Sequence, residues 1–448
     1  MTASKIKPAL ILTATVILAI LVLRHTPGLN GPWYWRWPWR ASTGIAPYLF
    51  LLPAAIPLAL AVLFFDRGSA MALPGLLLMM ATVFGSEMAL RLAESPSDPY
   101  VRVISIIEEP GATGYFTHAQ ALVNSHRNLR HWLGDFPHEM SAFSLHARNK
   151  PPGAILFYVP FLYLTRTADA AAFAAGLTIA FLATLSVPAT WWFIRALTGD
   201  ATAAFRGAAF MSLCPGLLVF FPEFDQFYPI YTVVLLLLWV KSLQSPKMIW
   251  PILLGLFFSF VCFQTFNLLA LGIFVIGYAI LLRRPKLALR QASISAATVI
   301  AAYAILWLIT GYNPIRTLMT GIALHKLDMP ATNRYWPQTI PFDLTDFALG
   351  TGWISIFLLA FFFLAPRDRR HWPIVLLCLL QIVAVAVAGV LQGETARVWI
   401  FLFPLLMLPV GLELARQSRL SVLGVLACLW LIMAVVSQNM IFVSTGVR

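Results

Sequence analysis

Residues 291–310 read QASISAATVIAAYAILWLIT and contain no charged side chain. A transmembrane helix needs about 20 consecutive, mainly apolar residues, so this stretch is long enough to cross a bilayer once. Similar runs recur along the 448-residue chain, of which 60% is hydrophobic and only 11% is charged. Soluble domains carry about 25% charged residues. The composition therefore excludes a water-soluble enzyme and predicts an integral membrane protein.

Thirteen such runs predict an all-α polytopic fold with about 13 transmembrane helices, in a single domain that covers residues 1–448. A further apolar run, residues 153–165, is too short to cross and suits an interfacial or re-entrant helix. Two longer segments, residues 93–152 and 311–346, remain as loops. The predicted spans are residues 8–23, 44–65, 69–92, 169–194, 207–221, 229–243, 249–264, 267–282, 291–310, 347–365, 373–391, 398–414 and 420–437.

Short basic loops set the expected orientation, because Lys and Arg are enriched on the cytoplasmic side of membrane proteins. Residues 283–290 and 367–370 are such loops. Successive loops alternate between the two sides of the membrane, so both long loops should lie on the side opposite these basic loops. We therefore expect a multi-pass protein of the bacterial inner membrane with its active site on the periplasmic side. The 31 Lys and Arg residues are scattered among short loops, so the net charge of +13 does not indicate a nucleic-acid partner.

Two adjacent carboxylates, Glu108 and Glu109, come directly before Pro110 and Gly111 in the first long loop. Neighbouring carboxylates repel each other, so one of them can have a raised pKa and accept a proton, or the pair can hold a cation. The alternative is a pair of solvated charges at the membrane surface.

The same loop ends in a basic element, HARNKPPG, at residues 146–153. A diproline holds the chain extended and can start a helix, since proline lacks an N–H that would be unpaired there anyway. His146, Arg148 and Lys150 therefore precede a rigid corner. We interpret the element as a phosphate-binding site, and the alternative is contact between its cations and lipid headgroups.

These motifs resemble the GT-C superfamily of integral-membrane glycosyltransferases. The motifs are an outer-loop carboxylate, a following helix with Tyr115 and Ala119, and the His-x-Arg-x-Lys-Pro-Pro-Gly element. The resemblance spans the topology of most of the chain, and its specific motifs cover about residues 105–160 and a few later turns. The superfamily includes the protein O-mannosyltransferases and the lipid A aminoarabinose transferase, which take sugars from polyprenyl phosphates. The resemblance implies that Glu109, or its neighbour Glu108, corresponds to the acidic residue of the family's outer loop, which acts as the base, and that Lys150 faces the lipid phosphate.

Other outer-face side chains extend the candidate site. Asp225 lies between two spans, where an ionisable group is costly unless it is paired or functional. Arg334 and Tyr335 combine a cation with an aromatic face that could stack on a sugar or anchor the membrane interface. Glu394 and Arg397, three residues apart, could form a local ion pair or bring a second guanidinium to the phosphate. We expect all five, with Tyr115, to contact substrate.

No metal ligand or cofactor is assigned. Five histidines between residues 118 and 146 match no compact ligand spacing such as HExxH, and the four cysteines form no CxxC pair. A divalent cation stays open as an alternative occupant of the Glu108–Glu109 pair.

The sequence thus favours an inverting glycosyltransferase that moves a sugar from a polyprenyl-phosphate donor to a glycan, lipid or protein acceptor on the periplasmic face. The chain has many apolar helices and few residues outside the membrane. This composition suits a donor whose polyprenyl tail stays in the bilayer. One alternative is a polymerase or ligase of lipid-linked glycans, which needs no carboxylate base in the first loop. A transporter or flippase is a second alternative, although we find no repeated halves in the sequence.

Overall fold

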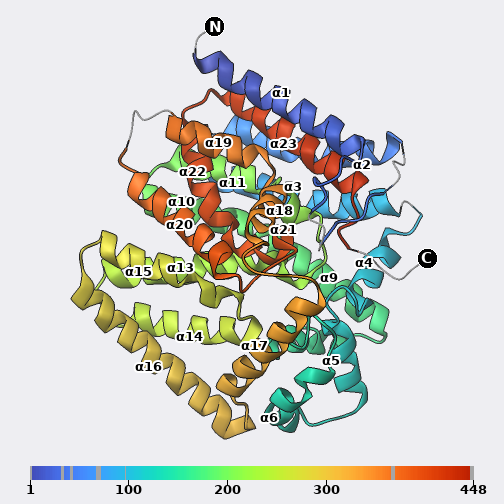
Figure 1. The fold of residues 1–448 in the computed structure, drawn as a ribbon, viewed down its shortest axis with the longest axis vertical. Coiled ribbons are helices and arrows are strands. Elements are labelled where there is room, and N and C mark those ends of the chain that lie inside the picture. The colour runs from blue at the N-terminus through green and yellow to red at the C-terminus, as the bar shows by residue number, and fades with distance from the viewer. Residues whose placement is uncertain are drawn as a thin grey trace. The chain divides into compact units, whose positions relative to one another are not determined.

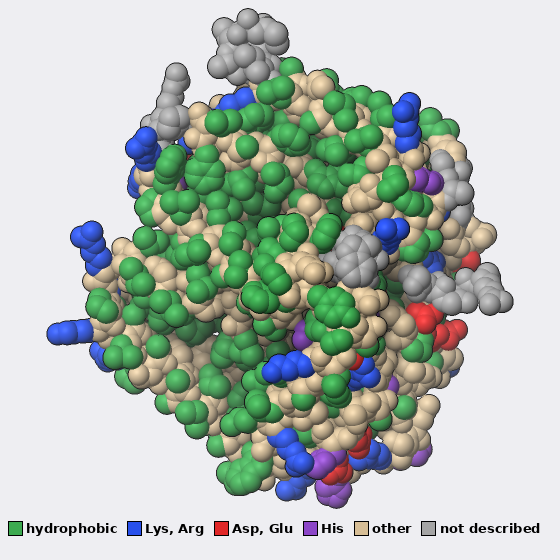
Figure 2. All heavy atoms as spheres, in the orientation of Figure 1, with side chains coloured by type: hydrophobic (Ala, Val, Ile, Leu, Met, Phe, Trp, Pro, Cys, Tyr) green, Lys and Arg blue, Asp and Glu red, His purple; other side chains and the backbone are tan. Residues whose placement is uncertain are grey.

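The computed structural model describes residues 3–31, 35–40, 44–66, 72–95, 97–364 and 369–443. Throughout these ranges the regular elements are helices (Figure 1), and the single extended pairing is an isolated bridge between Trp39 and Met440. The predicted all-α class is confirmed. On the face that Figure 2 draws, hydrophobic side chains form broad areas, and charged side chains lie mostly toward the margins and the lower right.

The helices follow one another closely along the chain. The short non-α segments are the π-helical η1 Ala61–Phe65 and the 3-10 helices η3 Met140–Ala142, η4 Phe224–Phe227, η5 Asn267–Leu271 and η6 Ile400–Leu402. The α-helices are α1 Ala3–Leu23, α2 Ala46–Leu60, α3 Ala72–Glu94, α4 Pro99–Glu108, α5 Tyr115–Asn124, α6 Leu129–Glu139, α7 Gly153–Leu156, α8 Val159–Leu164, α9 Ala168–Thr184, α10 Ser186–Thr198, α11 Ala201–Met211, α12 Pro215–Leu218, α13 Tyr228–Gln244, α14 Ile249–Gln264, α15 Gly272–Leu281, α16 Pro285–Thr310, α17 Pro314–Ala331, α18 Ile340–Thr351, α19 Ile354–Leu364, α20 Trp372–Ala388, α21 Thr395–Val398, α22 Phe403–Ala415 and α23 Arg419–Asn439.

Six helical stretches among the described residues are long and apolar enough to cross a membrane. The pair α18 and α19 would be a seventh span, although the chain bends by 99° between the two helices. Six more apolar helices have only 10–17 residues, which is shorter than the roughly 20 residues that a crossing usually needs. The six long stretches are Ala46–Phe65, Ala72–Glu94, Ala168–Thr198, Phe224–Gln244, Pro285–Thr310 and Arg419–Asn439.

The predicted count of thirteen spans is therefore not confirmed, although each predicted span overlaps at least one helix among the described residues. Residues 69–71 and 365 of two predicted spans lie outside the described residues. Apolar composition does not reveal where a helix breaks. The predicted span 207–221 is interrupted because α11 ends at Met211 and Pro215 begins the four-residue α12. Proline has no N–H to continue the ladder of a preceding helix.

The described residues form two compact units. The first is drawn from residues 1–102, 179–233 and 336–443, and the second from residues 103–178 and 234–335. In the first unit α2 packs on α3, α11 packs on α22, and α1 packs on α23. Figure 1 shows α1 and α23 side by side. In the second unit α14 packs on α16, and α5 contacts α7 and α8.

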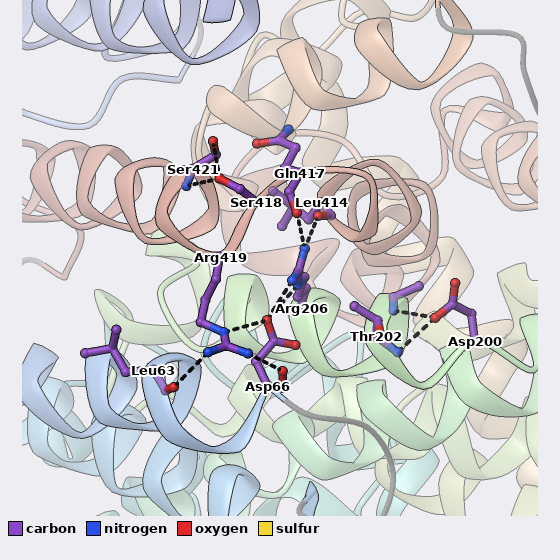
Figure 3. Close-up of polar contacts among 11 residues, drawn as sticks. Leu63, Asp66, Asp200, Thr202, Arg206, Leu414, Gln417, Ser418, Arg419 and Ser421 are labelled. Carbon is purple, nitrogen blue, oxygen red and sulfur yellow. Dashed lines mark hydrogen bonds and ion pairs between the residues drawn. The ribbon is translucent and has the colours of Figure 1, made fainter. Parts of the chain in front are cut away.

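A buried ionic network lies at the N-terminal end of α23 in the first unit (Figure 3). The Asp66 carboxylate accepts hydrogen bonds from Arg206 Nε at 2.9 Å and Nη2 at 2.7 Å. Arg206 Nη1 also donates to the carbonyl oxygens of Leu414 and Gln417, both at 2.7 Å. Arg419 adds a hydrogen bond to the Asp66 carbonyl oxygen at 3.2 Å. One guanidinium thus ties the end of α22 to the residue that follows η1.

A second ionic network lies at the opposite end of α23. Glu94 pairs with Arg91 at 2.8 Å, with Arg102 at 2.9 Å and with Arg40 at 3.5 Å. The Arg40 amide donates to the carbonyl oxygen of Asn439, the last residue of α23, at 2.9 Å. The 21 residues of α23 rise about 1.5 Å each, so the two charged layers are separated by about the thickness of a hydrocarbon core, near 30 Å.

The two predicted loops contain helices in the second unit. α5 begins at Tyr115, as predicted, and the short apolar segment at residues 153–165 forms α7 and α8. The 18-residue α17, within the predicted loop 311–346, was not predicted. Asn313 caps it by accepting from the Arg316 amide at 2.9 Å. α17 mixes charged and apolar residues, so a search for apolar runs does not detect it.

We expect that Asp66→Asn lowers the free energy of unfolding by about 3–5 kcal/mol, because removing one partner leaves the buried Arg206 uncompensated. Thermal unfolding in detergent measures the loss. Asp200→Ala is the matched control. Asp200 caps α11 by accepting from the Thr202 and Ala203 amides, and such a cap contributes about 0.5–2 kcal/mol. Equal losses in the two variants would contradict a special role for the ionic network.

Candidate functional site

The candidate base lies where α4 ends in the second unit. Val103 and Ile107 bury the apolar face of α4, and Glu108, its last residue, is half-buried. The chain then turns, with the Ala112 amide donating to the Glu109 carbonyl oxygen at 3.1 Å. Glu109 Oε1 accepts from the Gly111 amide, also at 3.1 Å. The Glu109 side chain is therefore folded back onto its own turn.

The two glutamates differ in their surroundings. Burial raises the pKa of Glu108, and the negative charge of Asp169 raises it further. A carboxylate with a raised pKa is better matched to proton transfer near neutral pH than an ordinary one. Glu108 thus has the more suitable environment for a base, whereas the resemblance pointed first to Glu109. The structure keeps both candidates in one turn.

The next segment is fixed to α5 by His118. Its Nε2 accepts from the Ser144 amide at 3.0 Å and lies 3.3 Å from Ser144 Oγ. Burial lowers the pKa of His118, which favours the neutral ring that such an acceptor role requires. Tyr115, a predicted substrate contact, is only 1% exposed at the start of α5. His118 therefore holds together the two ends of the candidate loop.

The basic element that follows brings its cations to different partners. Arg148 donates from Nε to Asp328 Oδ2 at 3.2 Å, and its Nη2 pairs with Asp328 Oδ1. Lys150 Nζ donates to the carboxamide oxygen of Asn267 at 2.6 Å. The carboxylate of Asp328 compensates the charge of Arg148, whereas an amide carries no charge. Neither partner was predicted from the sequence.

The remaining candidates of the second unit lie on the same loops. His146 is half-buried in the turn that leads to Lys150. Arg334 and Tyr335 follow the end of α17, where the Arg334 amide donates to the Met329 carbonyl oxygen at 2.9 Å. Tyr335 is 47% exposed, so its ring is accessible for stacking.

Three other candidates, Asp225, Glu394 and Arg397, meet in the first unit. Glu394 Oε2 lies 2.7 Å from Arg397 Nη2, Glu223 Oε1 lies 3.6 Å from Nη1, and Asp225 Oδ2 lies 3.8 Å from Nε. The side chains are 2–7% exposed. Burial raises the pKa of Glu223 to about 7. The local ion pair considered from the sequence is thus present, with two more carboxylates around the same guanidinium.

Two aspartates hold the turn that carries this cluster. Asp343 Oδ1 accepts from the Gly393 amide, and Asp346 Oδ2 accepts from the Ala396 amide, both at 2.9 Å. Asp346 Oδ1 also accepts from Trp37 Nε1 at 2.8 Å. Sequence reasoning assigned these aspartates no defined role. Their spacing on α18 was visible, but Gly393 and Ala396 lie 50 residues after them and Trp37 lies 309 residues before Asp346.

The structure therefore divides the candidates between the two units. Asp225, Glu394 and Arg397 belong to the first unit, and Glu108, Glu109, Tyr115, His146, Arg148, Lys150, Arg334 and Tyr335 belong to the second. Within the described ranges, no three His, Cys, Asp or Glu side chains are arranged to hold a metal ion. No protein-family model matches the chain, and no curated protein matches it in sequence. Function is thus argued from the residues and their contacts.

Gly114→Ala should destabilise the protein more than Gly199→Ala. Both glycines have φ of +72°, but an added Cβ has open space at Gly199, whereas at Gly114 it would overlap the Ser144 hydroxyl and lie 2.9 Å from Ser144 Cβ. We expect about 1–2 kcal/mol for the left-handed conformation at either site and about 1–3 kcal/mol more at Gly114. Thermal unfolding of both variants compares them. Equal stability would show that Ser144 yields without cost.

Proposed function

We propose that the protein is an inverting glycosyltransferase that uses a polyprenyl-phosphate sugar and acts on a glycan, lipid or protein acceptor. One observation carries the proposal. The second unit combines a carboxyl group of raised pKa, Glu108 at the end of α4, with the ammonium of Lys150, which lies on the segment that joins α4 to α7 and is bound to an amide. A base and a cation are the two groups that transfer from a phosphate leaving group requires.

The proposed reaction breaks the bond between the sugar's anomeric carbon and the phosphate oxygen of the donor. The bonding electrons stay on that oxygen, so the phosphate gains negative charge. An acceptor hydroxyl attacks the opposite face of the anomeric carbon, and its proton passes to Glu108 or Glu109. The products are the glycosylated acceptor and polyprenyl monophosphate. The configuration at the anomeric carbon is inverted because there is one displacement.

Lys150 is the proposed phosphate ligand. An ammonium placed where charge develops stabilises the transition state more than the ground state. Arg148, which is engaged by Asp328, is proposed to fix the approach to Lys150 and to add positive potential. His146, Tyr115, Arg334 and Tyr335 remain proposed substrate contacts, and the exposed Tyr335 ring suits stacking on a sugar.

We propose that Arg397 does not bind this phosphate. Three carboxylates lie within 4 Å of its guanidinium, and their combined charge opposes an anionic ligand. Asp225 and Glu394 would repel a phosphate for the same reason. We propose that these three residues, if they contact substrate, meet neutral hydroxyl groups rather than the phosphate.

The proposed site faces the periplasm of a bacterial inner membrane, and cysteine labelling tests this. The four native cysteines are buried, which gives a low background. Arg130→Cys and Lys286→Cys place thiols at exposed positions. In intact spheroplasts, a membrane-impermeant maleimide should label Arg130→Cys, whereas Lys286→Cys should react only after permeabilisation. The reverse pattern would put Lys150 on the cytoplasmic side and remove the proposed localisation.

Turnover of purified polyprenyl-phosphate sugar by glutamate variants tests the base. A positioned base typically contributes about 10² to 10⁴ in rate, so Glu108→Gln with Glu109→Gln should lose at least that factor at equal membrane levels. The two single variants identify which residue acts. Near-normal turnover in the double variant would exclude a carboxylate base at this turn.

The pH profile separates the two glutamates. A base must be ionised, so activity falls as the pH drops through its pKa. If Glu108 is the base, this acidic limb lies above the ordinary glutamate pKa of 4.5, because burial and Asp169 raise it. Asp169→Asn removes a negative charge and should move the limb to lower pH. An unmoved limb would assign the role to Glu109.

A further inference from the structure

A buried carboxamide lies against Lys150 in the second unit. Asn267 is the first residue of η5, which follows the break after α14, and it is only 3% exposed. Its backbone amide is held by Thr265 Oγ1 at 3.2 Å. Its side-chain oxygen accepts from Lys150 Nζ at 2.6 Å. Main-chain and side-chain bonds thus fix the position of the carboxamide.

The chemistry of the Lys150 ammonium determines which atom of the Asn267 carboxamide it contacts. An ammonium has three donors and no acceptor, so the Asn267 atom that it contacts must be the oxygen. The –NH₂ group therefore forms the other end of the side chain. This assignment does not depend on distinguishing nitrogen from oxygen by their positions.

The –NH₂ group of Asn267 has no hydrogen-bond partner among the described residues, and its nitrogen is buried. A buried donor left without an acceptor is costly, and natural proteins rarely keep one without a reason. An unpaired donor directly beside a cation indicates a negatively charged ligand that accepts from both.

The distances suit one phosphate group. The two ends of a carboxamide are about 2.3 Å apart, so Asn267 Nδ2 lies no more than about 5 Å from the Lys150 nitrogen. A phosphate presents several acceptor oxygens, and a charged oxygen between or beside the two nitrogens can accept from each. Hydrogen bonds from an ammonium to a charged oxygen are about twice as strong as those between neutral groups, so this pair of donors favours an anion over an uncharged hydroxyl.

We propose that Asn267 and Lys150 form a two-donor anion site that binds the phosphate of a polyprenyl phosphate, with Asn267 donating directly to a phosphate oxygen. The identity of the ligand as a polyprenyl phosphate rests on the proposed function. The inference adds Asn267, 117 residues from Lys150, as a second phosphate-binding residue. A neutral amide orients Lys150 without reducing its charge, which a carboxylate at this position would do. Asn267 thus both places the cation and extends the site.

Binding of farnesyl monophosphate, compared with farnesol, tests the site without requiring turnover. The full-length protein in detergent is titrated with each compound, and affinity is read from the thermal shift. The wild type should bind the phosphate at least about 10-fold more tightly than the alcohol, and Asn267→Leu should weaken phosphate binding about 10-fold or more. Farnesol binding should stay unchanged in the variant.

Gln291→Leu is the matched control. Gln291 is a second buried carboxamide of the same unit, 1% exposed on α16, and both of its polar side-chain atoms have no partner among the described residues. Gln291→Leu removes this carboxamide and should leave the affinity for farnesyl monophosphate unchanged. A loss as large as that of Asn267→Leu would overturn the proposal, because it would reflect general loosening of the unit.

A double-variant cycle separates direct donation from an effect through the lysine. If Asn267 only orients Lys150, then Asn267→Leu has no further effect once Lys150→Met has removed the ammonium. Direct donation instead predicts that Asn267→Leu weakens phosphate binding several-fold more in the Lys150→Met background. An unchanged affinity there would overturn the direct contact.

The outcomes also separate this inference from the proposed function. Unaltered phosphate binding by Asn267→Leu would remove the anion site while leaving sugar transfer to be tested by the glutamate variants. Weakened binding in Asn267→Leu, with no sugar transfer by the wild type, would retain the anion site and remove the glycosyltransferase. A wild type that binds farnesol as tightly as the phosphate would overturn both.

Discussion

Compensation of buried charge is the constraint on which the first unit depends. A charge removed from water is costly unless it is paired and hydrogen-bonded, and this chain has only 11% charged residues. In the first unit, buried ionic groups are drawn together at the helix ends, around Asp66 at one end of α23 and around Glu94 near the other. Between these layers the helices are mainly apolar, with Glu87 as a buried carboxyl group within α3. This separation is what a bilayer requires, since its core offers no water to any charge.

The sequence predicted local features well and distant contacts poorly. The all-α class, the start of α5 at Tyr115 and the short helical segment from Gly153 follow from composition and from the special geometry of proline. The number of spans did not follow, because hydropathy averages over the breaks that divide apolar chain. α17 escaped detection for the opposite reason, since its charged residues interrupt any apolar run.

The candidate site shows the same limit. Residue types indicated Glu108, Arg148 and Lys150, but their environments come from residues far along the chain. Asp328 lies 180 residues after Arg148, and Asn267 lies 117 residues after Lys150. A single sequence contains no signal for such pairings. The Glu394–Arg397 pair could be considered in advance because both residues lie within one turn.

The partners of the cations distinguish structural from ligand-binding roles. The guanidiniums of Arg206, Arg148 and Arg397 each meet at least one carboxylate, an arrangement that compensates their charge and stabilises the fold. Lys150 meets a neutral carboxamide whose second end is a buried donor. Replacing that amide by a carboxylate would compensate the charge of the ammonium, but it would also repel an anion. An amide at Asn267 is therefore the choice that keeps positive potential in the site, and it is consistent with a ligand that supplies the negative charge itself.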